Sequence, residues 1–279
     1  MNARVQYLGK WELGVLILCG AFVLLTVGAV GESGRSRAKE VACQANLRQW
    51  RDIFQGYIDP NGRFISGDKN TPGYWWVKYL SEEHKDWKRT RIWFCPTGTG
   101  PVVDENGRST QKLTIFSAWG IFQGAELGPN GVSGSYGLNG YVIPIDESAV
   151  PPHGPRQRTY ENGVPATDGW QNLREVPNAS TVPMFLDALR FDLWPVPYYP
   201  PAPSEFAAWT GNLTARCCIN RHDGAVNCLF VDGSVRKVGL KELWTLKWHQ
   251  SFNTAGPWTK AGGVMPSDWP EWIRPFKDY

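Results

Sequence analysis

One stretch of the chain limits its possible folds more than any other: residues 13–30 contain no charged side chain. At about 1.5 Å per residue, a helix of this run would be roughly 27 Å long, just enough to cross the hydrocarbon core of a bilayer. We therefore expect a helix that crosses the cytoplasmic membrane once. A cleaved signal peptide and a buried core helix are the alternatives, but the run is longer than the usual apolar region of a signal peptide.

A second helix is expected over residues 37–58, after a short Gly/Ser hinge at residues 31–36. Its apolar side chains recur at spacings of three and four, which is the period of an amphipathic helix. These side chains are Cys43, Leu47, Trp50, Phe54 and Tyr57. The helix-breaking residues 59–62 then end the stem.

The expected organisation has three parts: an N-terminal segment (residues 1–12), a helical stem (residues 13–58) and a globular α+β head (residues 59–279). The head alternates short apolar segments with loops rich in Gly and Pro. The chain has 15 Trp and 13% aromatic residues, so it has the apolar side chains that a disordered chain lacks. The formal net charge of +3 gives no basic stripe, which argues against a nucleic-acid partner.

The strongest local signal in the head is a β-hairpin over residues 226–238. Two extended runs flank Asp232 and Gly233, a dipeptide favoured in two-residue type I′ turns. That turn would place Phe230 opposite Val235. Further strands are expected at residues 92–94 and 135–143, and an apolar segment at residues 181–186 leads into Asp187.

Several short motifs follow one another in a distinctive order. His222 is followed, after nine residues, by Asp232 and Gly233, with Arg221 and Asn227 close by. Earlier come a Cys-x-x-Asn-Leu stretch that begins at Cys43, Phe-Cys-Pro around Cys95, Ser-Tyr-Gly-Leu-Asn at residues 135–139, and Phe-Leu-Asp ending at Asp187. This order resembles a large bacterial family of prepilin-like proteins, similar to type II secretion pseudopilins and type IV pilins.

The resemblance implies a pilin-like fold, in which a long N-terminal helix carries a head with a small antiparallel sheet. It implies a non-catalytic subunit of a type II secretion or type IV pilus-like apparatus, with the head on the periplasmic or extracellular side. The partners would be the membrane, other pilin-like subunits or secretion machinery, in a homo-oligomer or filament. The expected structural motif comprises His222, Asn227, Asp232, Gly233 and Asp187.

Glu12 stands where such proteins carry a glutamate that is thought to neutralise the N-terminal amine of a neighbouring subunit. The residue five positions before it is Tyr7 and not the Gly of the usual cleavage motif. Processing by a prepilin peptidase, and with it filament assembly, therefore stays open.

Three other functions are weighed against the structural one. A hydrolase using His222 with Asp187 and Asp232 would need these groups to converge in a cleft. The Trp-rich surface could make the protein an envelope-anchored adhesin that binds glycans. Calcium could bind near Asp223 and Asp232, although two acidic residues are few for an ion that takes six to eight oxygens.

The cysteines complete the expectations. The chain has six, none in a Cys-x-x-Cys pair, so a zinc site is poorly supported and neither a metal nor another cofactor is expected. Cys43 lies on the apolar stripe of the stem, and Cys95 follows an apolar run in the head. We expect a Cys43–Cys95 disulfide that ties stem to head; the alternative is that both are small buried apolar residues.

Overall fold

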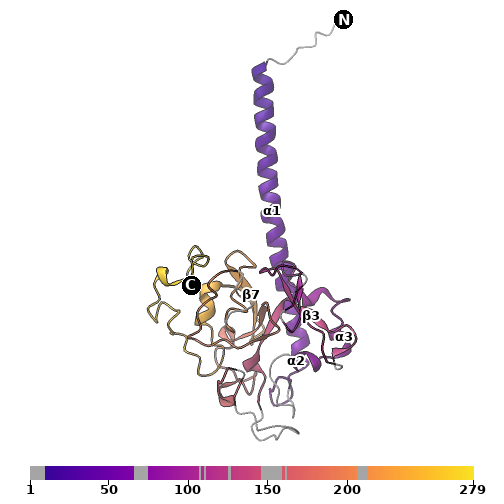
Figure 1. Cartoon of the computed structure of the whole chain (residues 1–279), viewed down its shortest axis with the longest axis vertical. Helices are drawn as coiled ribbons and strands as arrows, with labels where there is room; N and C mark the ends of the chain where they lie inside the picture. Colours follow the sequence, from indigo (N-terminus) through magenta and orange to yellow (C-terminus); the bar gives the residue numbers. More distant parts are fainter. Residues whose placement is uncertain are drawn as a thin grey trace.

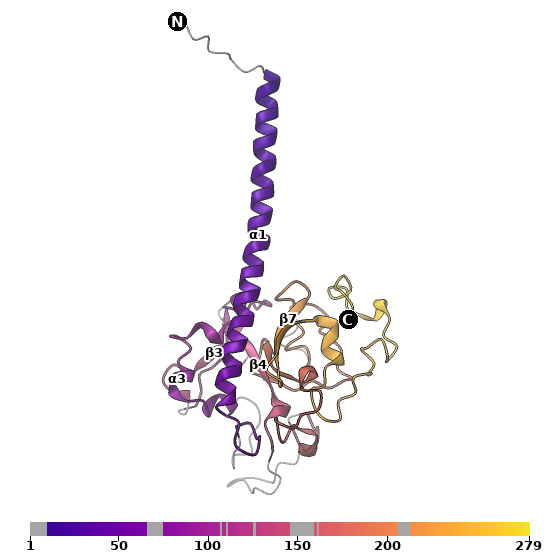
Figure 2. The ribbon, with the colours of Figure 1, turned by 180° about the vertical axis from the view of Figure 1, so that it is seen from behind.

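A computed structural model of the chain describes residues 10–65, 75–106, 108–109, 111–124, 127–145, 159–160, 162–205 and 213–279. A single straight helix, α1 (Lys10–Gln55), projects from a rounded head that holds all the strands (Figures 1 and 2). Only the C-terminal part of α1 is embedded in the head. The predicted hinge at residues 31–36 is wrong, because these residues continue the helix without a break.

The buried face of α1 matches the predicted stripe. Cys43, Leu47, Trp50 and Phe54 are buried, and Tyr57 just beyond the helix is half-buried. The stripe packs against the head near strands β7 (Ala225–Phe230) and β8 (Val235–Gly239) and a short 3₁₀ helix, η1 (Arg91–Trp93). The prediction of an amphipathic stem that docks on the head is therefore confirmed for these residues.

The prediction of a membrane anchor is contradicted. In the described part of the chain, no helix has the length and apolar character needed to cross a membrane. The apolar run is one section of a longer helix that continues through Arg35, Arg37 and Lys39 before it reaches the head. The side chains of Glu12 and of residues 20–30 lie outside the described residues. The predicted single-pass location in the cytoplasmic membrane, with an exported head, is contradicted by the same finding.

The head contains two sheets instead of one small antiparallel sheet. The first has the order β1-β2-β3, with β1 (Val102–Val103) parallel to β2 (Ala118–Ile121) and β2 antiparallel to β3 (Val132–Gly134). The second has the order β6-β4-β5-β7-β8. Its members are β4 (Tyr136–Asn139), β5 (Pro183–Asp187), β6 (Asp192–Leu193), β7 (Ala225–Phe230) and β8 (Val235–Gly239).

Both sheets are mixed. The β4–β6 pair is parallel, whereas the β4–β5, β5–β7 and β7–β8 pairs are antiparallel. The predicted pilin-like fold with one antiparallel sheet is therefore wrong. The parallel pairs join strands through irregular loops, so they leave no hairpin signal in the sequence. Strands β5 and β7 are buried along their whole length, as expected for the centre of a covered sheet.

Helical structure in the described head is short. The two α-helices are α2 (Trp75–Lys78) and α3 (Glu82–Lys85). Besides η1, the 3₁₀ helices are η3 (Gly140–Val142), η4 (Ala166–Asp168), η5 (Ala179–Thr181), η6 (Leu240–Thr245) and η7 (Pro266–Asp268). Residues 92–94, expected as a strand, lie mostly in η1.

The β7–β8 hairpin is present, but its turn differs from the predicted one. Leu229 lies opposite Val235, one residue out of the expected register. The Phe230 N–H donates to the Ser234 carbonyl, and the Gly233 N–H donates to the Phe230 carbonyl at 2.9 Å. Gly233 has a φ of 83°, whereas Asp232 has no positive φ. The loop thus has three residues ending in a left-handed glycine, a common hairpin class other than type I′.

A cluster of aromatic rings around His249 fills one side of the head. The imidazole is buried, with its ring centroid 4.7 Å from that of Tyr141 and 5.4 Å from that of Phe252. Its Nε2 atom has no hydrogen-bond partner among the described residues, and its Nδ1 atom lies 3.1 Å from Ser251 Oγ. Burial lowers the pKa of His249 to about 4, with Asp168 opposing the shift and Lys247 adding to it.

We expect His249 to make the protein less stable in mild acid. The unfolded chain binds a proton at an ordinary pKa near 6.5, whereas the folded chain resists it down to about 4. Stability is therefore lost as pH falls through this window, by up to about 1.4 kcal/mol per pH unit from this one group. Urea melts at several pH values between 7 and 4 should show that the free energy of unfolding falls less steeply with falling pH in His249→Phe than in the wild type. An equally steep fall in both proteins would contradict this assignment.

A buried cysteine, aspartate and histidine cluster as the candidate functional site

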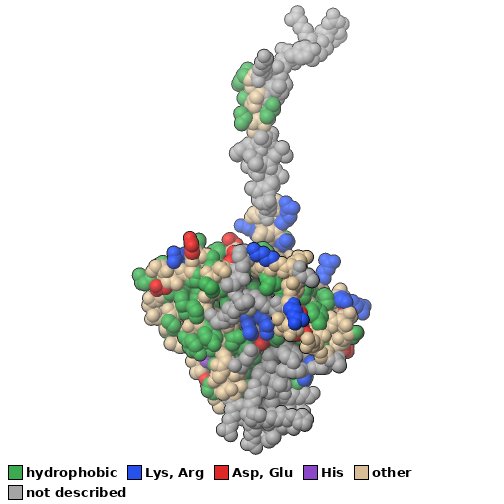
Figure 3. Space-filling view, viewed as in Figure 1, with side chains coloured by type: hydrophobic (Ala, Val, Ile, Leu, Met, Phe, Trp, Pro, Cys, Tyr) green, Lys and Arg blue, Asp and Glu red, His purple; other side chains and the backbone are tan. Residues whose placement is uncertain are grey.

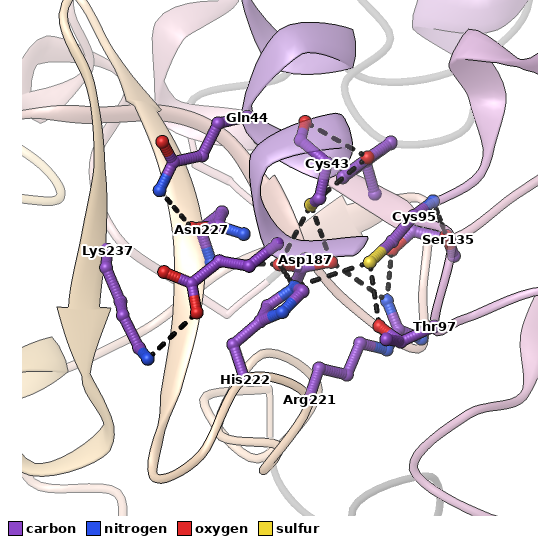
Figure 4. A network of polar contacts seen from close by, with 12 residues as sticks. Cys43, Gln44, Cys95, Thr97, Ser135, Asp187, Arg221, His222, Asn227 and Lys237 are labelled. Atoms are coloured by element: carbon purple, nitrogen blue, oxygen red, sulfur yellow. Dashed lines mark hydrogen bonds and ion pairs between the residues drawn. The ribbon is translucent and has the colours of Figure 1, made fainter. Parts of the chain in front are cut away.

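The carboxylate of Asp187 is the centre of the site (Figure 4). Asp187 ends β5, opposite Tyr136 of β4, and is completely buried. Its Oδ2 accepts a hydrogen bond from the Asn227 N–H at 2.8 Å and lies 3.1 Å from His222 Nε2. Its Oδ1 lies 3.5 Å from Arg221 Nη1. The pairing of β5 with β4 therefore holds the Asp187 carboxylate in the core, beside the cationic side chains of His222 and Arg221.

His222 reaches this carboxylate from the loop that leads into β7. A tight turn follows it, with positive φ at Asp223 and Gly224, and the His222 N–H donates to the Ala225 carbonyl at 3.1 Å. The ring nitrogen Nε2 that faces Asp187 also lies 3.3 Å from Cys95 Sγ. One nitrogen thus contacts both an oxygen and a sulfur.

Two thiols from distant parts of the chain complete the cluster. Cys43, on α1, places its Sγ 3.6 Å from Asp187 Oδ2, and the Tyr136 hydroxyl lies 3.3 Å from the same sulfur. Cys95, just after η1, is held by its N–H, which donates to Ser135 Oγ at 2.7 Å. Both thiols are buried and free. The structure brings the expected pair together as free thiols, with no disulfide between them.

The Arg221 side chain lies next to the cluster and hydrogen-bonds to the segments around it. Its guanidinium is buried and donates to the carbonyls of Ile115 and Ser117, each at 2.8 Å, and to that of Ser135. These carbonyls belong to the segments around β2 and β4. The guanidinium therefore places a fixed positive charge beside Asp187 and joins the two sheets.

The charges of the cluster shift the pKa values of its members. Burial by itself would lower the pKa of His222, but the Asp187 carboxylate outweighs it and raises the value to about 10. Burial would raise the pKa of Asp187, but His222 and Arg221 hold it below its usual range. Burial is likewise outweighed at Cys95, whose pKa falls to about 6 beside the Cys43 thiol and His222, whereas the pKa of Cys43 is raised by burial.

The other predicted motif residues lie differently. Asn227 takes part through its backbone, and its side-chain oxygen accepts a hydrogen bond from Gln44 Nε2 of α1 at 3.1 Å. Asp232 and Gly233 are at the opposite end of β7 from His222, so the two ends of the His-X9-Asp-Gly signature do not form one site. Asp232 Oδ1 accepts instead from the Ser234 N–H at 2.9 Å and stabilises the turn.

The geometry bears on the alternatives raised by the sequence. Asp223 and Asp232 stand at opposite ends of β7, a strand of about 20 Å at the usual rise per residue, so they cannot share a calcium ion. A nucleophilic relay through histidine uses both ring nitrogens, whereas here Nε2 alone faces Cys95 and Asp187. Among the Trp side chains that the structure describes, Trp11 of α1 is the one that is largely exposed, which leaves little aromatic platform for a glycan on the head.

Comparisons with protein-family models, with curated proteins and with solved structures gave no match for this chain. The resemblance to prepilin-like proteins therefore rests on the motifs alone and stays a prediction. Of those motifs, the Cys43, Cys95, Asp187 and His222 segments supply the cluster. Sequence reasoning named all four residues but did not see them as one group.

Proposed function

We propose that this protein is a non-catalytic structural subunit that assembles with copies of itself through the free part of α1. The observation that supports this proposal is that the N-terminal part of α1 is apolar and projects away from the head. Trp11, Ile17 and Leu18 are 75%, 64% and 72% exposed in the isolated chain. Figure 3 shows hydrophobic side chains on the projecting helix, far from the head.

The cost of such exposure favours a partner. Each square ångström of apolar surface removed from water contributes about 25 cal/mol, and large exposed apolar patches mark interaction surfaces. Trp11 and Leu18 are seven residues apart and share one face, whereas Ile17 points about 100° away. A helix that is apolar on more than one side suits a bundle of several like helices, because neighbours cover it from several directions.

The choice of identical copies follows from the shape of the chain. Equal helices side by side match one another in length, and their uncharged runs at residues 13–30 meet in register while the heads stay outside the bundle. The motif order shared with prepilin-like secretion and pilus proteins supports the same reading. The buried position of Cys95, His222 and Asp187 supports a structural over a catalytic role, because a substrate could not reach the thiol, the imidazole or the carboxylate of this cluster.

The test is the oligomeric state of the full chain. We expect the wild-type protein to self-associate in sedimentation velocity runs over a concentration series. A doubly substituted chain, Ile17→Glu with Leu18→Glu, should associate at least tenfold more weakly, which corresponds to about 1.4 kcal/mol or more. The reason is that a bundle would have to bury unpaired carboxylates.

Met265→Glu provides the matched control, because Met265 is 60% exposed but belongs to the head. It should associate like the wild type. A wild-type chain that stays monomeric at all concentrations, or a double variant that assembles like the wild type, would reject the proposal.

A further inference from the structure

The buried cluster has the composition of a metal site. Cys43, Cys95, Asp187 and His222 each offer one ligand atom, and these four atoms lie within 4.8 Å of one another. We propose that these residues bind one zinc ion in a four-coordinate S₂NO site, and that the ion fastens α1 to the head. This site is independent of the assembly surface on the free part of α1.

The distances suit a tetrahedral ion. Zinc bonds of about 2.3 Å to sulfur and about 2.0–2.1 Å to nitrogen or oxygen separate neighbouring ligand atoms by about 3.3–3.8 Å. The separations are 3.1 Å from His222 Nε2 to Asp187 Oδ2, 3.3 Å from Nε2 to Cys95 Sγ, and 3.6 Å from Oδ2 to Cys43 Sγ. Small side-chain adjustments would therefore place the ion at the centre of the four atoms.

The surroundings supply what bound ligands need. The Asn227 N–H hydrogen-bonds Asp187, the Tyr136 hydroxyl contacts the Cys43 sulfur, and Thr97 Oγ1 lies 2.9 Å from the Cys95 sulfur. Such partners orient metal ligands and tune their basicity. Together they fix three of the four ligands before an ion arrives.

The charges also balance. Two thiolates and one carboxylate bring three negative charges, which a divalent ion and the guanidinium of Arg221 neutralise. His222 would bind as the neutral imidazole and release its proton. Two sulfur ligands select zinc over magnesium or calcium, which prefer oxygen.

The proposed site joins four separate segments of the chain. Cys43 comes from α1, Cys95 from the segment after η1, Asp187 from the end of β5, and His222 from the loop before β7. An ion held by all four would cross-link the stem to the segment after η1 and to the second sheet. Binding should therefore be linked to the stability of the docked helix.

The test begins with metal content. Full-length protein, purified without chelator and under reducing conditions, should carry about one zinc per chain by inductively coupled plasma mass spectrometry. After removal of zinc, Co²⁺ should give sulfur-to-cobalt charge-transfer absorption and the intense visible bands of a tetrahedral site. Chelation should lower the melting temperature, and added zinc should restore it.

Two variants make the test specific. Cys95→Ser should bind zinc at least tenfold more weakly and lose part of the sulfur-to-cobalt absorption. Cys228→Ser replaces another buried free thiol and should keep both properties. If Cys95→Ser fails to fold, the cobalt spectrum of the wild type still decides the matter.

Two results would overturn the proposal. One is a reduced wild-type chain that takes up less than about one-tenth of an equivalent of zinc or cobalt. The other is native protein in which non-reduced peptides show a Cys43–Cys95 disulfide and zinc is absent. Neither result would affect the self-association measured with the Ile17 and Leu18 variants.

Discussion

Asp187→Asn is expected to destabilise the protein by about 3–5 kcal/mol, because it removes one partner of a buried ion pair. The amide has nearly the same shape but no charge. Arg221 and His222 would then keep buried positive charge without a carboxylate to neutralise it. Equilibrium unfolding of the metal-free full chain in urea, followed by Trp fluorescence, gives the change in free energy of unfolding.

Asp232→Asn serves as the control for this charge change. Asp232 is exposed at the tip of the β7–β8 hairpin, so its neutralisation should alter the free energy of unfolding by less than about 1 kcal/mol. A loss at Asp187 no larger than the loss at Asp232 would show that the buried carboxylate does not neutralise the cluster.

Trp50→Ala should cost about 3–5 kcal/mol, the range found for removal of a large aromatic side chain from a packed core. The Trp50 ring lies edge-on to Trp93, with centroids 4.7 Å apart, and 5.3 Å from the ring of Phe185. Its Nε1–H also donates to the Ile92 carbonyl at 2.9 Å. The substitution therefore opens a cavity and leaves that carbonyl without its donor.

The same urea titration measures this loss, and Val41→Ala is its control on the same helix. Val41 is largely exposed, so its truncation should change stability by less than about 0.5 kcal/mol. If Trp50→Ala were as mild as Val41→Ala, the docked face of α1 would contribute little to the stability of the head.

The parts of the fold that could be predicted are those controlled by local periodicity. The stripe of Cys43, Leu47, Trp50 and Phe54 is visible because helical spacing alone places these side chains on one face. The strand expected at residues 135–143 corresponds to β4 followed by η3, and the extended runs around Asp232 correspond to β7 and β8. Each of these elements carries its signal within a few neighbouring residues.

The errors concern choices that distant contacts decide. The Gly and Ser residues at 31–36 suggested a hinge, but helix propagation from both sides outweighs a cost of about 1 kcal/mol per glycine. The apolar residues at 92–94 have the composition of a strand, yet η1 forms there and the Trp50 indole N–H binds the Ile92 carbonyl. The parallel pairing of β4 with β6 depends on loops whose paths the sequence does not reveal.

The candidate site shows the same limit. Short spacings such as Cys-x-x-Cys identify metal sites built from one or two local segments. Here the ligands come from a helix, a segment after η1, a strand end and a loop, so no spacing rule relates them. Cys95 and Asp187 directly follow apolar runs and Cys43 lies on the apolar stripe of α1, and these positions are the signal that could have placed three of the four in the core; His222, between Arg221 and Asp223, carries no such signal.

The unbroken course of α1 couples the orientation of its two ends. Within a continuous helix, each residue turns the chain by about 100° and advances it by about 1.5 Å. The docked stripe at Cys43 fixes the helix against the head, and thereby also fixes the direction in which Trp11 and Leu18 face. In an assembly formed through those residues, the rotation of every head about the assembly axis would be set by the number of residues between the two contacts.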